Sequence, residues 1–217
     1  VFEPASRRFV RIELRGQCSL RCEEPGRLSV IEARDMDFFF DEAQRLKLAV
    51  ATGAAHARSL EKEAPREITS ERLESAFIPR GKETELQAVT SQGRTTLRIS
   101  PEPGAGASPK AVESVLEADS LKASLRPGGR FLADAEATGN AQFVMTPLVP
   151  TPTADRKRVR AAKFKADFYD KENAIKSFVA DGGAVVDFEP IAPESRRPRR
   201  TLSGRTVTGH VQETTQE

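Results

Sequence analysis

Tryptophan is absent from this 217-residue chain and tyrosine occurs once, so twelve phenylalanines supply nearly all of its aromatic surface. Proteins that bind polysaccharides or single-stranded nucleic acids use exposed aromatic platforms, which disfavours both functions here. The 34 basic and 32 acidic side chains nearly cancel, so no overall field draws the molecule to nucleic acid. The sequence also lacks any apolar run of the ~18–20 residues that a membrane-spanning helix needs.

Histidine and cysteine, which build many catalytic and metal sites, occur only twice each. The sequence contains no GxSxG, GxxxxGK[ST], HExxH or paired CxxC motif. Asp35 and Asp37 form the one candidate carboxylate pair, but no histidine or further ligand is nearby in the sequence. We therefore expect a protein that is not an enzyme and that holds no cofactor and no metal.

The two cysteines, Cys18 and Cys22, are expected to be small side chains on the buried face of one strand. If that strand is continuous, their Cα atoms are ~13 Å apart at ~3.3 Å per residue, too far for a disulfide. A turn that brings them together is the alternative.

A repeated pattern runs through the chain and is clearest over residues 116–143. Small or apolar side chains recur there at every second residue, in two runs separated by the turn Pro127-Gly128-Gly129. A period of two is that of a strand with one buried face. Each run also contains one step of three residues, which predicts a bulge or corner where the strand bends.

Copies of this pattern predict an all-β protein forming one elongated domain over residues 1–217. Its recurring glycines, Gly53, Gly93, Gly139 and Gly182, are 40, 46 and 43 residues apart. For the residues just before Leu116, a short helix is the alternative to a strand. The pattern comprises a half-repeat over 9–22, full repeats over 31–59, 68–99, 116–145 and 159–188, and a half-repeat over 202–211.

Three connections between repeats, at 100–111, 144–158 and 189–200, are irregular and rich in proline. The last two end in basic runs that should emerge at one edge of a stack of repeats. This rim could bind phosphates through charge-assisted hydrogen bonds; simple solvated loops are the alternative, and nucleic-acid binding ranks lower. The predicted phosphate-contacting rim is Arg156, Lys157, Arg158, Arg196, Arg197, Arg199 and Arg200.

The repeats resemble the OstA-like family of periplasmic lipopolysaccharide-transport proteins, which includes LptA, LptC and the N-terminal domain of LptD. The likeness covers about residues 9–211, and the long Pro- and Arg-rich connections depart from the family's simpler members. It is carried by LEADSL at 116–121, AEATGNA at 135–141, IEARD at 31–35 and VADGGAV at 179–185.

This resemblance implies a twisted β-jellyroll of two antiparallel sheets that splay into a V with an apolar groove. It implies that lipopolysaccharide or a similar amphiphile is carried in the groove, in the periplasm. It further implies end-to-end strand pairing with other jellyroll domains of the transport system, or with further copies, as a bridge between the inner and outer membranes. A membrane tether in a segment outside this sequence is also an expectation.

The residues themselves agree with a groove, because many buried positions of the repeat are Ala, Ser or Gly and leave room between layers. The half-repeats at the two ends predict unpaired edge strands, which can bind a partner by strand addition. The alternative function is a structural β-solenoid interaction module with a filled core and no lipid ligand, in which each large side chain is ordinary core. The predicted groove residues are Phe38, Phe40, Phe77, Leu121, Leu125, Phe143, Phe164, Phe168 and Phe178.

Overall fold

A computed structural model describes residues 2–3, 8–24, 27–61, 65–81, 83–100, 111–129, 131–170 and 175–210. Within these ranges the secondary structure consists of strands, with no helix. The residues before Leu116 that could have formed a helix belong to a strand. Most of the 100–111 connection, and Val211 at the end of the last half-repeat, lie outside the described residues. The strands are β1 (Phe2–Glu3), β2 (Arg8–Phe9), β3 (Arg11–Glu24), β4 (Arg27–Phe40), β5 (Leu46–Glu61), β6 (Arg66–Arg80), β7 (Glu83–Ile99), β8 (Val112–Leu125), β9 (Leu132–Pro147), β10 (Asp155–Phe168), β11 (Ile175–Pro190) and β12 (Arg200–His210).

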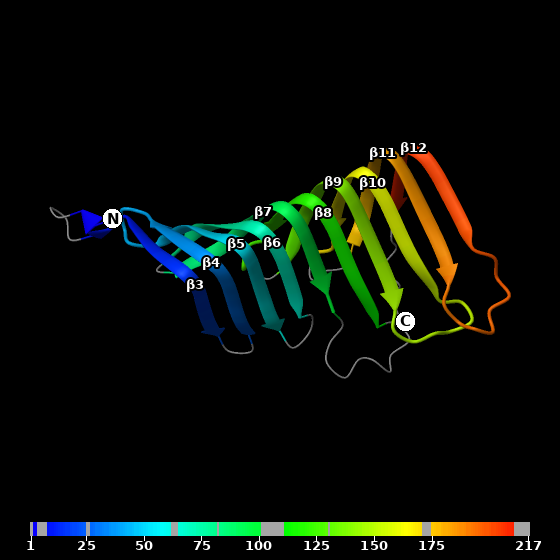
Figure 1. Ribbon diagram of the computed structural model, residues 1–217, viewed down its shortest axis with the longest axis horizontal. Helices are drawn as coiled ribbons and strands as arrows, with labels where there is room; N and C mark the ends of the chain where they lie inside the picture. Colours follow the sequence, from blue (N-terminus) through cyan, green and yellow to red (C-terminus); the bar gives the residue numbers. More distant parts are fainter. Residues whose placement is uncertain are drawn as a thin grey trace.

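Strands β3 to β12 form one ten-stranded antiparallel sheet, in which each strand pairs with its neighbours in the sequence. The sheet runs the length of the molecule, with β3 and β12 at its two edges (Figure 1), and β1 pairs only with β2. The prediction of an all-β antiparallel fold is confirmed. Each full repeat lies on one pair of consecutive strands, and the two half-repeats lie on the edge strands.

A line of bulges crosses the middle of the sheet. In the pairing of β8 with β9, Glu117 lies opposite Gln142, but the next pair is Ser120 with Thr138, so β9 has one residue more. The bulge on β9 consists of Gly139 and Asn140, and both have positive φ angles (75° and 50°). Glycine adopts this conformation readily. The odd step predicted between Ala118 and Leu121 lies opposite this bulge, whereas the one predicted between Leu132 and Ala135 lies at a separate register shift next to the turn. Equivalent bulges lie at Gly16-Gln17, Gly53-Ala54, Gly93-Arg94 and Gly182-Gly183.

The sheet bends sharply along this line. Phe143 on β9 lies opposite Val159 on β10, and Phe164 is five residues further along β10, ~16 Å away if the sheet were flat. The ring centroids of Phe143 and Phe164 are nevertheless 5.4 Å apart, so the parts of the sheet on either side of the bulges face each other (Figure 1). We call them arm A (18–24, 27–33, 55–61, 66–70, 95–99, 112–118, 141–147, 155–161, 184–190, 200–204) and arm B (11–15, 35–40, 46–52, 72–80, 83–92, 120–125, 132–138, 163–168, 175–181, 206–210).

The apolar side chains of both arms point into the space between them and form two clusters. The larger cluster is built on β8–β11 and includes fully buried alanines such as Ala137 and Ala180, both 0% exposed. The smaller cluster is built on β4–β6 around Met36 and Leu73. We call the space under β3–β7 the N-terminal compartment and the space under β8–β11 the C-terminal compartment.

Candidate functional site

Phenylalanine rings stack on one another in the C-terminal compartment. Phe164 stacks on Phe143 from the other arm and on Phe178 from its own arm, with ring centroids 5.4 and 5.5 Å apart. This packing joins the arms directly, as in an ordinary protein core. Six predicted groove residues belong to this cluster, either buried or packed against it: Leu121, Leu125, Phe143, Phe164, Phe168 and Phe178.

The N-terminal compartment contains a cavity of about 160 Å³ between the arms. Of the predicted groove residues, Phe38 lines it, while Phe40 and Phe77 pack against the same small cluster. Small side chains such as Ala49 and Ala51 form part of its wall, and this is why the space is left open. The other lining residues are Leu20, Ser29, Ile31, Met36, Val50, Ala57, Arg58, Ser59, Arg66, Ile68, Leu73, Ser75, Leu86 and Val89.

The sequence-based groove prediction missed most of this wall. Leu73, Leu86 and Val89 occupy positions of the repeat, so the period of two did indicate that they face inward. The prediction selected the largest side chains, but a cavity forms where such side chains are missing. The useful signal was therefore the run of small residues on β5.

One end of the cavity is polar. Ser29, Ser59 and Arg66 lie opposite one another on β4, β5 and β6, near the outer end of arm A. The next inward row along these strands, Ile31, Ala57 and Ile68, is apolar. Arg58 is also in the lining, but its side chain lies on the opposite face of β5 from Ala57 and Ser59, where its Nη2 is 3.5 Å from Oε2 of the exposed Glu32. The cavity thus combines an apolar body with a row of two serines and one arginine, Arg66, at one end.

A buried cluster of hydroxyl groups lies at the bulge line between the two compartments. Thr95 and Ser91 are 1% and 0% exposed, and their hydroxyl oxygens are 2.7 Å apart. The Ser70 hydroxyl donates to the carbonyl oxygen of Gln92 at 2.8 Å and lies 3.2 Å from the Thr95 hydroxyl. The backbone N–H of Leu121 on β8 donates to Ser91. These bonds satisfy the buried hydroxyls within the protein.

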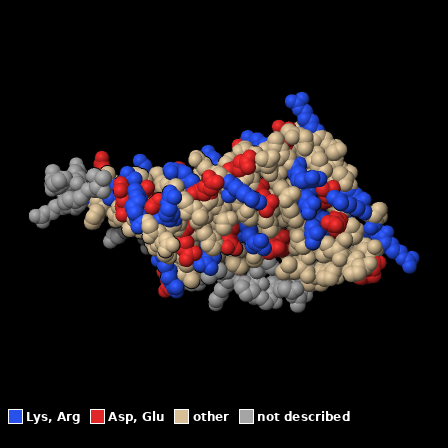
Figure 2. All heavy atoms as spheres, viewed as in Figure 1, with Lys and Arg blue, Asp and Glu red and all other residues tan. Residues whose placement is uncertain are grey.

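The two basic connections meet at the same end of strands β10, β11 and β12. Asp155 pairs in register with Pro190 there, and Phe188 pairs with Arg200. Figure 2 shows acidic and basic side chains interspersed over the viewed face, with several basic ones at the β9–β12 end. In the predicted rim, Arg156 faces Glu189 at 3.5 Å. Lys157 and Arg196 are exposed, and Arg158 is half-buried.

Two buried aspartates hold three of the predicted rim arginines. Asp155 Oδ1 accepts from Arg197 Nη2 at 2.7 Å, and its Oδ2 accepts from Arg200 Nη2 at 2.9 Å. The guanidinium of Arg199 lies 3.4 Å from the carboxylate of Asp187, a residue that is 4% exposed. These guanidinium groups therefore tie β12 and its connection to β10 and β11.

Asp187 is held in its ionised form. The Thr201 hydroxyl donates to it at 2.8 Å, and Arg160 approaches it to 3.1 Å. The hydrogen bond from Thr201, with the charges of Arg199 and Arg160, lowers the pKa of Asp187 below its usual value, although burial opposes this.

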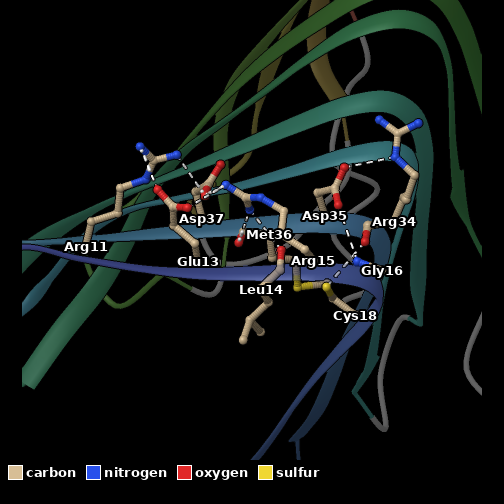
Figure 3. Close-up of polar contacts among 10 residues, drawn as sticks. All are labelled: Arg11, Glu13, Leu14, Arg15, Gly16, Cys18, Arg34, Asp35, Met36 and Asp37. Carbon is tan, nitrogen blue, oxygen red and sulfur yellow. Dashed lines mark hydrogen bonds and ion pairs between the residues drawn. The ribbon is translucent and has the colours of Figure 1, made fainter. Parts of the chain in front are cut away.

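The N-terminal edge strand exposes both charged and apolar side chains. On its outer face, Arg11 and Arg15 lie 2.9 and 2.7 Å from Asp37 of the neighbouring strand β4. In Figure 3, Leu14 points away from these charges, toward the inside of the bend, where it is 38% exposed. Ile12 on the same face is 36% exposed. This inner surface lacks the covering that a further strand would provide.

The cysteines differ from the prediction that both are buried. Both thiols are free, but Cys18 is half-buried against the smaller cluster and Cys22 is exposed. The reason is that β3 is the edge strand, so nothing packs on its far side.

No catalytic or metal-binding constellation occurs in the described part of the chain. No three His, Cys, Asp or Glu side chains there are grouped to hold a metal ion. Arg34 donates to Asp35 at 2.9 Å and lowers the pKa of that carboxyl, whereas a general acid needs a raised pKa. His56 Nε2 lies 2.6 Å from Glu67 Oε1, within hydrogen-bond distance.

In the described ranges, no helix is long and apolar enough to cross a membrane. Comparison with protein-family models, with curated proteins and with solved structures gives no match. What the chain binds must therefore be inferred from the geometry and chemistry of its interior.

Proposed function

We propose that the bent sheet is an OstA-like β-jellyroll whose two arms are the two layers of a V, and that the chain is a periplasmic lipopolysaccharide-binding transport protein. The observation that carries the proposal is the apolar cavity of about 160 Å³ between the arms. A sheet that only needed a core would close this space, because unfilled apolar volume costs stability. In this proposal, acyl chains of lipopolysaccharide or a similar amphiphile occupy it.

Elementary energetics favour such a ligand. Each methylene that leaves water for an apolar surface contributes about 0.8 kcal/mol. Arg66, in one row with Ser29 and Ser59 at the polar end of the cavity, suits an anionic headgroup. The exposed rim cations Lys157 and Arg196 are available for further phosphates, whereas Arg197 and Arg200 already pair with Asp155.

The partners in this proposal are jellyroll domains, or further copies, that pair end to end. Within the sheet, β3 and β12 each have one neighbour, so each leaves one edge open. The inner faces of these strands expose Leu14 at 38% and Leu202 at 56%. A bridge between membranes would use such edges by strand addition.

The alternative, a structural interaction module with a filled core, is supported by the stacked phenylalanines of the C-terminal compartment. If that packing extended through the whole interior in solution, no lipid would bind. The two functions therefore differ in what happens at the N-terminal compartment.

A photo-crosslinking amino acid at Phe38 tests the proposed function. Phe38 lines the cavity, whereas Glu32 on the same strand is exposed and serves as the matched control. We expect lipopolysaccharide adducts at position 38 and little labelling at position 32. Equal labelling at both positions, with no lipid in extracts of the gently purified protein by mass spectrometry, would favour the filled-core module.

A further inference from the structure

We propose that the interior is divided, and that only the N-terminal compartment takes lipid: a single acyl chain of an amphiphile with an anionic headgroup. This inference rests on the proposed function and sharpens it, because it assigns the ligand to one part of the molecule and limits how much of it is buried. The aromatic side chains of the C-terminal compartment are then structural.

The size of the cavity sets the limit of one chain. A protein cavity of about 150 Å³ holds a benzene-sized group. The cavity of about 160 Å³ under β3–β7 therefore fits the end segment of one hydrocarbon chain and not several chains side by side. Leu86 and Val89 on β7 form its wall nearest the C-terminal compartment.

Two features close the interior beyond β7. The hydroxyls of Ser70, Ser91 and Thr95 form a buried polar cluster that offers a chain no apolar surface. Behind it, the rings of Phe143 and Phe164 are in contact across the two arms. A chain that continued along the bend would have to separate these rings.

The polar end of the cavity indicates the headgroup. Of its five polar lining residues, Ser29, Ser59 and Arg66 form one inward-facing row near the outer end of arm A. The side chain of Arg58, on the same arm, faces outward to Glu32. Guanidinium and hydroxyl groups are donors, and carboxylates and phosphates are acceptors. A fatty acid and a phosphorylated lipid share this chemistry of one apolar chain and one anionic group.

The absence of tryptophan from the chain allows a direct test of the division. Two single-tryptophan proteins are made, Phe38→Trp in the N-terminal compartment and Phe164→Trp in the C-terminal compartment. Each is titrated with a fatty acid brominated near its methyl end, and then with lipopolysaccharide carrying brominated chains, while quenching of tryptophan fluorescence is measured. Phe178→Trp, at a half-buried position of the same cluster, replaces Phe164→Trp if circular dichroism shows a folding defect.

We expect saturable quenching at position 38, with about one fatty acid bound per protein, and at least fivefold less quenching at position 164 or 178. Equal quenching at both positions would overturn the division while leaving lipid binding between the arms in place. Quenching at neither position would overturn both. Quenching by lipopolysaccharide but not by the fatty acid would show that a single chain is not sufficient, and would also overturn the inference.

A second measurement tests the headgroup. Arg66→Gln should weaken binding of the fatty acid about tenfold or more and leave binding of the corresponding fatty alcohol unchanged. Arg98→Gln is the matched control, because Arg98 is exposed and pairs with Glu113 on the neighbouring strand, away from the cavity. If Arg66→Gln and Arg98→Gln have the same effect on fatty-acid binding, the assigned headgroup position is wrong.

Discussion

Single residues decide where the sheet can bend. Gly139 has a φ of +75°, and a Cβ atom built on it would lie 2.7 Å from the Cβ of Asp119 on the neighbouring strand. The position therefore excludes a side chain for two separate reasons, one in the backbone and one in the contact. Gly183 has a similar φ of +85°, but a Cβ there would meet nothing within 4 Å.

We predict that Gly139→Ala lowers the free energy of unfolding by about 2–4 kcal/mol, and Gly183→Ala by about 1–2 kcal/mol. The loss at Gly183 is the cost of a left-handed backbone conformation for a residue that has a Cβ atom. The additional loss at Gly139 is the cost of displacing the Asp119 side chain. Urea unfolding followed by circular dichroism measures both values. Equal losses would mean that Asp119 moves aside without cost.

The buried carboxylate of Asp187 gives the stability a defined pH dependence. Its pKa is lowered in the folded state by the hydrogen bond from Thr201 and by Arg199 and Arg160, so its stabilising contribution is complete above the unfolded value of about 4. The contribution is lost as the pH falls through the lower pKa of the folded state. The stability difference between wild type and Asp187→Asn should therefore shrink as the pH falls below about 4.

Urea unfolding of both proteins from about pH 6 downward measures this difference. Thr201→Val serves as the control: it keeps the carboxylate but removes the contact that lowers its pKa most, so the pH-dependent loss should be smaller and complete at a higher pH. A wild-type to Asp187→Asn difference that stays constant to the lowest pH would contradict the assigned role.

Among the elements, β12 is the one whose attachment depends most on charge. It pairs on one side only, and its residues are mostly exposed. Asp155 at the start of β10 holds both Arg197, in the connection before β12, and Arg200, in β12 itself. The arginines predicted to bind phosphate thus also fasten the edge of the sheet.

We predict that Asp155→Ala destabilises the protein by about 1–3 kcal/mol, because it leaves two guanidinium groups without their buried partner. The figure is modest because the Arg197 and Arg200 side chains are 36% and 57% exposed and retain contact with water. Hydrogen exchange should become faster in β12 before it does in β9. Glu194→Ala, at an exposed position in the same connection, should change neither quantity.

The sequence allowed the strands and their bends to be predicted because both leave local marks. Alternation with a period of two is set by the geometry of each strand. The step of three from Ala118 to Leu121 marks the place on β8 that faces the bulge, and the step from Leu132 to Ala135 marks a second register shift near the turn. The hydrogen-bonded order of the strands is the order of the repeats along the chain. The exposure of Cys22 could not be predicted in this way, since it depends on what lies beside β3 and not on β3 itself.

The candidate site was less accessible to prediction than the strands. Phe38 and Phe164 both occupy inward-facing positions in the first half of a repeat, yet Phe38 lines a cavity and Phe164 stacks on a ring of the other arm. The difference arises from the side chains opposite each ring, contributed by other strands and the other arm. Likewise, Arg197 and Arg200 are both paired with Asp155, which lies more than 40 residues earlier in the chain.

For the whole molecule, the two edges of the sheet are complementary. The direction of the strands alternates, so β12 of one copy would lie antiparallel to β3 of another. Arg205 is the single residue opposite the bulge Gly182-Gly183, as Arg34 is opposite Gly16-Gln17. Aligning Arg205 with Gly16-Gln17 continues the bulge line and predicts Cys18 opposite Gly204.

We predict that Gly204→Cys, in a Cys22→Ser background, forms a disulfide with Cys18 of a second copy under mild oxidation. Directly opposed residues of antiparallel strands are ~4.5–5.5 Å apart at Cα, within the range that a disulfide spans. A ladder of oligomers on non-reducing gels, lost on adding a reductant, is the expected result. Gly204 has an ordinary φ, and a Cβ there meets only the Thr206 carbonyl oxygen, at 3.4 Å.

Ser203→Cys, in the same background, is the matched control. It is shifted by one residue, so its side chain points to the opposite face of the strand. It should give few cross-links. Equal cross-linking of the two variants would indicate random collision, and cross-linking of Ser203→Cys alone would indicate a different register.

The bulge line also imposes a rule of parity on how this architecture can grow or shrink. Odd-numbered strands carry the two-residue bulge and even-numbered strands supply the one residue that faces it. Duplicating or removing one strand would set two bulges against each other and reverse the chain direction, whereas changing the count by two preserves both. Length can therefore change in steps of one hairpin, so that homologous chains of different reach should differ by whole pairs of strands while keeping the same bend.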